Sequence, residues 1–88
     1  MIISEQIRAA RQLVKITADE LAVLSGVGVA TIRRFELMSG VPSGNARSIE
    51  AIQNALELAG VEFIGSPDNR PGVRLVTKNM TDVGRKPQ

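Results

Sequence analysis

The segment from Thr17 to Glu36 constrains the fold of this chain more than any other stretch. It begins with Thr-Ala-Asp-Glu, in which the Thr17 hydroxyl can accept from the amide of Glu20 while the glutamate carboxylate reaches back to the threonine amide. This capping box predicts the start of a helix. That helix should stop at Gly26, because glycine readily adopts the left-handed backbone that ends helices, and Gly28 can cap the next one. The pattern predicts two helices joined by a very short turn.

The apolar positions of these two helices predict how they pack together. We expect the first helix to bury Leu21, Ala22 and Leu24, and the second to carry Ile32 and Phe35 inward. Ala22 is small where the second helix must cross close above the first, and the two larger residues of the second helix fill the angle between them. This arrangement predicts a near-perpendicular crossing.

Two further helices flank this pair. Ser4 can cap a first helix that ends near Lys15, and the segment Ala46–Ala59 repeats the helical pattern before Gly60 closes it. The helix that carries Ile32 and Phe35 is expected to end at Gly40 and Pro42. Apolar residues recur at helical spacing in the two flanking helices, at Ile7, Ala10, Leu13, Val14, Ile49, Ile52, Ala55, Leu56 and Ala59.

A β-hairpin is predicted after the helices. Val61–Ile64 and Val73–Val76 read as two short strands, and the turn-rich stretch Gly65–Gly72 separates them. From Lys78 onward the chain is polar, which predicts a flexible tail. With 88 residues the chain has room for one core. We expect a mainly α fold, with a helical bundle over residues 1–60, a hairpin over 61–77 and a tail over 78–88.

The composition argues against most enzyme classes. The chain contains no Cys and no His, which excludes thiolate nucleophiles, disulfides, the usual zinc ligands and the usual proton shuttle. The carboxylates are scattered, and no cluster of Ser, Lys or Asp is arranged for nucleophilic catalysis. We therefore expect a protein that is not an enzyme and that needs neither a metal nor a cofactor.

Charge and aromatic content narrow the choice of partner. The net charge is only +2, but the adjacent Arg33 and Arg34 permit contact with phosphate. Phe35 and Phe63 are the only aromatic residues, so few rings are available for stacking unpaired bases. No apolar run approaches the roughly 18 residues of a membrane span. Double-stranded DNA is thus the favoured nucleic acid, and a cytoplasmic location without a membrane partner is expected.

The motif TADELAVLSGVGVATIRRFE, from Thr17 to Glu36, resembles that of the Xre family, the Cro and phage-repressor type of helix-turn-helix. The resemblance extends over roughly Ile3 to Ala59 and implies a lambda-repressor-like helical bundle whose third helix reads the major groove. It further implies a transcriptional regulator, most often a repressor, that acts as a homodimer. Because relatives pair an arginine of helix one with the glutamate that closes helix three, an ion pair between Arg11 and Glu36 is expected. The alternative is that both are solvated charges.

The resemblance also implies which residues contact DNA. The base-reading positions correspond to Val29, Ala30, Arg33 and Arg34. The two apolar residues can touch a thymine methyl group, whereas Arg34 can grip the O6 and N7 acceptors of guanine and Arg33 can reach phosphate. The alternative is that the two arginines are simply a solvated face of the helix.

Contacts at the edges of the groove are implied at further positions. Ala18 stands where many relatives carry a phosphate-binding glutamine, so one clamp on the DNA backbone is weakened. Ser, Thr and Asn at helix starts can alternatively be caps rather than ligands. The remaining implied contacts are Thr17, Gly28, Thr31, Ser43, Asn45 and Arg47.

The hairpin is the predicted dimer interface. One helix-turn-helix reads few base pairs, so specificity usually needs two copies on half-sites about 34 Å apart. The apolar residues assigned to this interface are Val61, Phe63, Ile64, Val73 and Leu75. Alternatively, the hairpin folds back on the helix over residues 46–59 and completes the core of its own chain.

A second function stays open at this point. The chain can instead be a protein-interaction module, such as an antitoxin, whose C-terminal segment from Val73 to Gln88 folds on a partner while DNA binding is secondary. The low apolar content beyond Val76 argues against a large interface in that segment.

Overall fold

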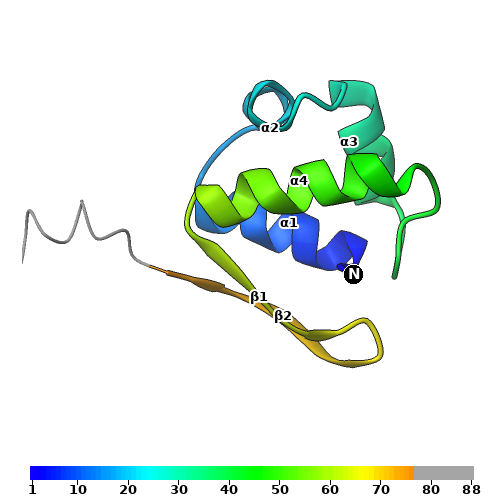
Figure 1. Ribbon diagram of the computed structural model, residues 1–88, viewed down its shortest axis with the longest axis vertical. Coiled ribbons are helices and arrows are strands. Elements are labelled where there is room, and N and C mark those ends of the chain that lie inside the picture. The colour runs from blue at the N-terminus through cyan, green and yellow to red at the C-terminus, as the bar shows by residue number, and fades with distance from the viewer. Residues whose placement is uncertain (77–88) are drawn as a thin grey trace, which may run out of the picture.

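The computed structural model describes residues 1–76 and has a mainly α architecture that ends in a β-hairpin, as predicted. The predicted tail over 78–88 and the last residue of the predicted hairpin, 77, lie outside the described residues. In Figure 1, α2 and α3 lie on one side of α1 and α4, and the hairpin lies on the other side. The elements are α1 (Ser4–Leu13), α2 (Ala18–Ser25), α3 (Val29–Leu37), α4 (Ala46–Leu58), β1 (Val61–Ser66) and β2 (Asn69–Leu75).

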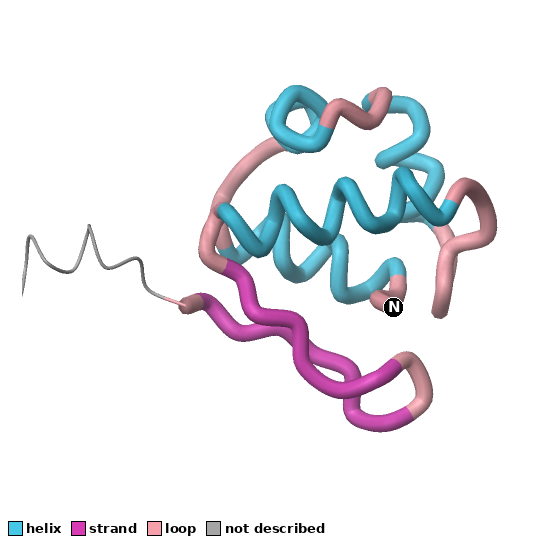
Figure 2. Tube along the Cα trace, viewed as in Figure 1, coloured by secondary structure: helices cyan, strands magenta, loops and turns pink. Residues whose placement is uncertain are grey.

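The start of α2 and the turn into α3 are as predicted. The amide of Glu20 donates to the Thr17 hydroxyl at 3.0 Å, and the Thr17 amide donates to the Glu20 carboxylate at 2.8 Å. Gly26 ends α2 with φ +76°, and Gly28 takes the position before α3. Figure 2 shows how short the connection between these two helices is. The start of α2 and the turn into α3 therefore depend on residues that are close together in the sequence.

The core lies between the helices. Its largest fully buried apolar residues come from every helix, and Val61 of the hairpin joins them at 3% exposed. These core residues are Ile7, Leu21, Ile32, Phe35, Ile52 and Leu56.

Two residues that were expected to be apolar contacts of the core are exposed. Leu24 is 58% exposed, because the inward stripe of α2 runs through Ala18, Leu21 and Ser25 at helical spacing and leaves Leu24 to one side. The Ser25 hydroxyl donates to the carbonyl of Leu21 at 2.7 Å, which satisfies this inward polar group. Leu13 is 36% exposed at the end of α1. The predicted burial of Leu24 was therefore wrong, and Leu13 continues the apolar repeat of α1 without being buried.

The start of α1 also differs from the prediction. Ile3, not Ser4, is the cap residue, and its amide donates to the Gln6 side chain at 2.9 Å. Ser4 is the first helical residue and is fully buried. Because Gln6 supplies the capping oxygen from within the helix, the helix start moves back by one residue. Helix α1 then ends at Leu13, before Lys15 with φ +59°.

The third helix ends earlier than predicted. Its last residue is Leu37, and Met38 already has an extended backbone with ψ 172°. The carbonyl of Gly40 accepts from the Ser4 amide at 2.8 Å, and the Gly40 amide donates to Glu5 at 3.1 Å. These bonds hold the loop after α3 against the start of α1, so the helix stops before Gly40 and Pro42.

The hairpin is longer than predicted, and its turn is only Pro67–Asp68. Ser66 pairs with Asn69, and a bulge at Gly65, with φ +76°, lets both strands extend into the expected turn region. The cross-strand pairs Val61 with Leu75 and Phe63 with Val73 place their side chains on one face. That face is turned toward the helices.

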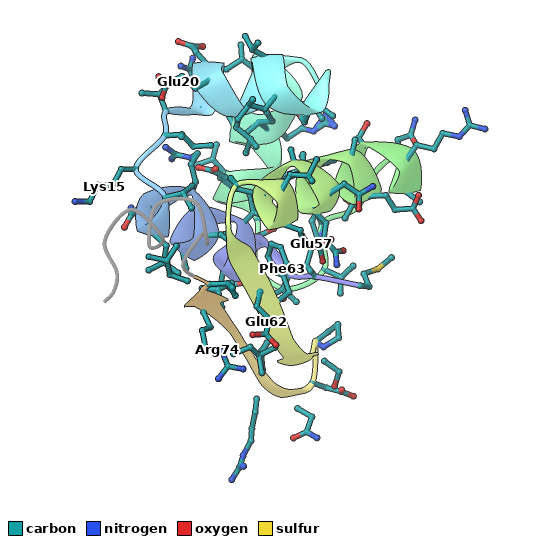
Figure 3. All side chains as sticks on the ribbon, turned by 60° about the vertical axis from the view of Figure 1, so that its left-hand side comes forward. Lys15, Glu20, Glu57, Glu62, Phe63 and Arg74 are labelled. Atoms are coloured by element: carbon teal, nitrogen blue, oxygen red, sulfur yellow. The ribbon has the colours of Figure 1, made fainter. Side chains whose placement is uncertain are left out.

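Most of the predicted dimer face is therefore part of the protein's own core. Val61 is 3% exposed, and Phe63 and Val73 are partly buried against the core. In Figure 3, Phe63 points toward the helices, whereas Glu62 and Arg74 lie together on the hairpin. The alternative that the hairpin folds back on its own chain is confirmed for this face, and Val61 is too deeply buried to be an exposed contact. The use of the hairpin by a second copy stays a prediction. Ile64 and Leu75 remain 36% and 48% exposed.

A buried glutamine fastens the hairpin to α1. The Gln6 side chain is 4% exposed, and its amide nitrogen donates to the carbonyls of Ile64 at 3.2 Å and Gly72 at 2.8 Å. These bonds join both strands of the hairpin to α1.

Over residues 1–76, no helix combines the length and apolar character that a membrane span requires.

Candidate nucleic-acid interface

The solvent-facing side of α3 is the candidate interface. Ile32 and Phe35 are fully buried, so the opposite side of the helix faces outward. Residues on an α-helix are separated by about 100° of rotation, which groups Ala30, Arg33, Arg34 and Leu37 on that outward side. All of these four are exposed.

The two arginines of α3 extend in different directions. The guanidinium of Arg33 lies 3.7 Å from the Asp19 carboxylate of α2, and both side chains are largely exposed. The guanidinium of Arg34 lies over the Phe35 ring, 5.4 Å from its centroid. It also lies near Gly44, since a Cβ built on that glycine would be 3.8 Å from Arg34 Nη2. One arginine thus leans toward α2 and the other toward the loop before α4.

The start of α4 lies beside Arg34. Asn45 is the N-cap of this helix, and its side-chain oxygen accepts from the Arg47 amide at 2.8 Å. The alternative reading of Asn45 as a cap is therefore confirmed. Arg47 is exposed, and the Ser43 hydroxyl lies 4.0 Å from the Met38 sulfur. Ser43 and Asn45 flank Gly44, which lies on the side to which Arg34 leans.

Two predicted contacts have side chains that face the core instead. Ala18 is 9% exposed and belongs to the core, so only its backbone is available to a ligand. Val29 is partly buried and packs against the core at the start of α3. Ala18 therefore stays a predicted contact only through its backbone at the start of α2, and Val29 stays one through the exposed part of its side chain. The Thr17 hydroxyl is engaged in the capping box, Thr31 is half-buried and Gly28 is exposed.

The predicted ion pair between Arg11 and Glu36 is confirmed. Arg11 Nε and Nη2 donate to the two carboxylate oxygens of Glu36 at 2.8 and 2.9 Å, and Nη1 donates to the Ile16 carbonyl at 3.0 Å. The hydrogen bond to Glu36 raises the pKa of Arg11. The pair joins α1 to the last turn of α3 and therefore sets the orientation of α3 on the bundle.

A second arginine of α1 supports the same end of α3. Arg8 Nη1 donates to the carbonyls of Glu36 and Met38, the latter at 3.2 Å. These carbonyls belong to the end of the helix, where backbone acceptors lack intrahelical partners. Cationic groups are favourable at that end of a helix dipole. The sequence contains no local signal for this role of Arg8, because the helix C-terminus that it contacts is distant in sequence.

Leu37 is a surface residue that the sequence analysis missed. It is 87% exposed at the end of α3, on the same side as Ala30. The signal was present in the sequence as a spacing of seven residues from Ala30, which corresponds to nearly two helical turns.

A shallow apolar depression on α2 was missed as well. It has a volume of about 310 Å³ and is lined by Ile16, Glu20, Val23 and Leu24. Val23 is 83% exposed and Leu24 is 58% exposed. The sequence did not predict this depression, because Leu24 was expected to point inward.

No model of a known protein family matches the sequence, and no curated protein matches it.

Proposed function

We propose that this protein binds double-stranded DNA sequence-specifically, with α3 in the major groove, and acts as a transcriptional repressor. The observation that carries the proposal is the outward face of α3, where Arg33 and Arg34 diverge to either side of an exposed helix. The major groove is wide enough to admit an α-helix, and phosphates border it on both sides. Diverging guanidinium groups suit that geometry.

The connection between α2 and α3 supports a helix-turn-helix of the lambda-repressor type. The short turn through Gly26 and Gly28 keeps the two helices close, and the pair of Arg11 and Glu36 holds α3 on the bundle. The resemblance of the segment Thr17 to Glu36 to the Xre family points in the same direction. In this motif α2 lies across the DNA backbone while α3 enters the groove.

The contacts that the arginines make within the protein are weak enough to be exchanged for DNA. The cation–π contact of the exposed Arg34 over the buried Phe35 ring contributes about 0.5–2 kcal/mol. A bidentate contact with guanine discriminates by about 1–3 kcal/mol. Exposed ion pairs such as that of Arg33 with Asp19 contribute about 0–1 kcal/mol. Because these internal contacts are no stronger than the contacts that DNA offers, we expect Arg34 to bind a guanine edge and Arg33 to bind phosphate. Arg47 is a further expected phosphate contact.

The proposed active form is a homodimer, because one α3 contacts only a few base pairs. The hairpin still offers a surface to a second copy. Within the described residues, β1 and β2 form a two-stranded sheet, so each strand has an unpaired edge. Ile64 and Leu75 are the apolar residues of the two strands that remain exposed, at 36% and 48%.

Duplex binding at increasing salt tests the proposal. Fluorescence anisotropy with pooled random duplexes should show association at low salt, and the logarithm of the affinity should fall linearly with the logarithm of salt concentration. The variant Arg33→Ala/Arg34→Ala should bind far more weakly than Arg70→Ala/Arg74→Ala, which removes the same charge from the hairpin. Absence of binding by the folded full chain would refute the function.

A protein-interaction module is the second candidate, and the depression on α2 favours it. Exposed aliphatic residues such as Val23 and Leu24 around a concave surface are typical of a partner site. The C-terminal segment that could capture a partner lies largely outside the described residues. A protein with only this role would not distinguish the α3 arginine variant from the hairpin control in the duplex titration, so the same experiment separates the two candidates.

A further inference from the structure

The outward face of α3 has an apolar centre line. Ala30 and Leu37 are seven residues apart, which is about 20° short of two full turns, so they lie almost on one line along the helix. Arg33 and Arg34 fall on opposite sides of that line, at about 100° from one another. Leu37 is 87% exposed, the most exposed large hydrophobic residue in the described part of the chain.

The residues around Leu37 are held away from it. Glu36 is paired with Arg11, and the Met38 carbonyl accepts from Arg8. Arg33 leans toward Asp19, and Arg34 lies over Phe35. A ligand that settles between the two arginines therefore meets the apolar line directly.

Only one base offers an apolar group in the major groove, namely the C5 methyl of thymine. The other groups on the groove edges are hydrogen-bond donors and acceptors. Leucine can neither donate nor accept, so a polar base edge packed against it would lose water without gaining a partner. The charge on both sides of the line complements the phosphates that border the groove.

We propose that Leu37 is a specificity-determining residue that packs on the 5-methyl group of a thymine in the DNA site; this inference rests on the proposed function. The distance of this thymine from the guanine read by Arg34 follows from the helix. Leu37 lies almost one turn beyond Arg34, or about 5 Å along the axis. Base pairs are about 3.4 Å apart, so a helix that follows the groove places the thymine within about two base pairs of that guanine.

Methyl deletion in the DNA tests the contact. Duplexes that bind the full chain are selected from a random pool, and each thymine of the best duplex is replaced in turn by deoxyuridine, which lacks only the methyl group. Affinities are measured by anisotropy for the wild type, for Leu37→Ala and for the matched control Leu58→Ala. Leu58 is 80% exposed on α4, so both variants remove an exposed leucine. Circular dichroism confirms that each variant is folded.

At one thymine near the guanine, deoxyuridine should weaken wild-type binding about fourfold, which corresponds to the burial of one methyl group. Leu37→Ala should bind the thymine duplex about as weakly as the wild type binds the deoxyuridine duplex. Replacement of that thymine by deoxyuridine should not change the affinity of this variant. Leu58→Ala should behave as the wild type. If no deoxyuridine changes wild-type affinity, or if Leu37→Ala retains the full methyl effect, the inference is overturned while DNA binding stands. If no duplex binds at all, the proposed function itself fails.

Discussion

Arg11 contacts both carboxylate oxygens of Glu36 and so joins the last turn of α1 to the last turn of α3. Glu36 directly follows the fully buried Phe35, and the side chains of the pair are only 22% and 11% exposed. An ion pair at this depth gains attraction but also loses hydration, so its net contribution to stability is small compared with the cost of breaking it. Its main consequence is that α3 has one orientation on the bundle.

Replacement of one partner should therefore cost more than replacement of both. Arg11→Met leaves the Glu36 carboxylate without its partner and should lower the free energy of unfolding by up to about 3 kcal/mol, the lower end of the cost for a buried pair, because both side chains are partly exposed. The double variant Arg11→Met/Glu36→Leu should recover part of that loss. Urea unfolding of the wild type, both single variants and the double variant measures the coupling. Additive losses would show that the two side chains do not interact in solution.

The bulge at Gly65 should tolerate no side chain. A Cβ at this position would lie 2.2 Å from the Arg70 carbonyl oxygen, and the backbone has φ +76°. Gly65→Ala should therefore destabilise the protein by at least about 2 kcal/mol, from backbone strain and the clash with the main chain. Gly72→Ala is the matched control in the facing strand, because a Cβ there meets no atom within 4 Å. Thermal unfolding of both variants measures the difference, and equal midpoints would contradict the structure of this turn.

Glu5 should make stability depend on pH in the acid range. Its pKa is lowered from 4.5, first by a hydrogen bond from its own amide and then by one from the Gly40 amide. A carboxylate with a lowered pKa in the folded state stabilises the protein above its unfolded pKa, and this contribution is lost as the pH falls through the folded value. The free energy of unfolding should thus fall on acidification below about pH 5. Glu5→Gln should show a shallower dependence in urea titrations across that range, and an unchanged slope would exclude Glu5 as a cause.

The two arginines nearest the start of α4 should differ in what they recognise. Arg34→Ala should cost about 1–3 kcal/mol on the preferred duplex and relax the choice of base at one position, whereas Arg47→Ala should weaken all duplexes alike. The reason is that base edges carry sequence information and phosphates do not. Titration of each variant against the selected duplex and a random pool measures both effects. Equal losses on the two DNAs for Arg34→Ala would reduce Arg34 to a phosphate contact.

The sequence by itself determined the elements whose boundaries depend on neighbours a few residues away. The capping box of Thr17 and Glu20, the end of α2 at Gly26 and the inward positions Ile32 and Phe35 were all predicted correctly. Each rests on hydrogen bonds or side-chain spacing within about one helical turn, so local chemistry is sufficient. The Arg11 and Glu36 pair is distant in sequence, and it was predicted only through the family resemblance.

Only the tertiary structure decided what packs against the apolar face of the hairpin and which side of α2 is buried. Alternation in the hairpin predicts that Val61 and Phe63 share a side, but it carries no information on whether that side meets a second copy or the protein's own helices. The decision came from burial of that side against the core and from Gln6, which bonds to Ile64 and Gly72, 58 and 66 residues away. The outward position of Leu24 was decided in the same way, because packing of α2 on the bundle selects the stripe through Ser25. Such contacts form only when the chain has folded, since burial depends on segments that are far apart in the sequence.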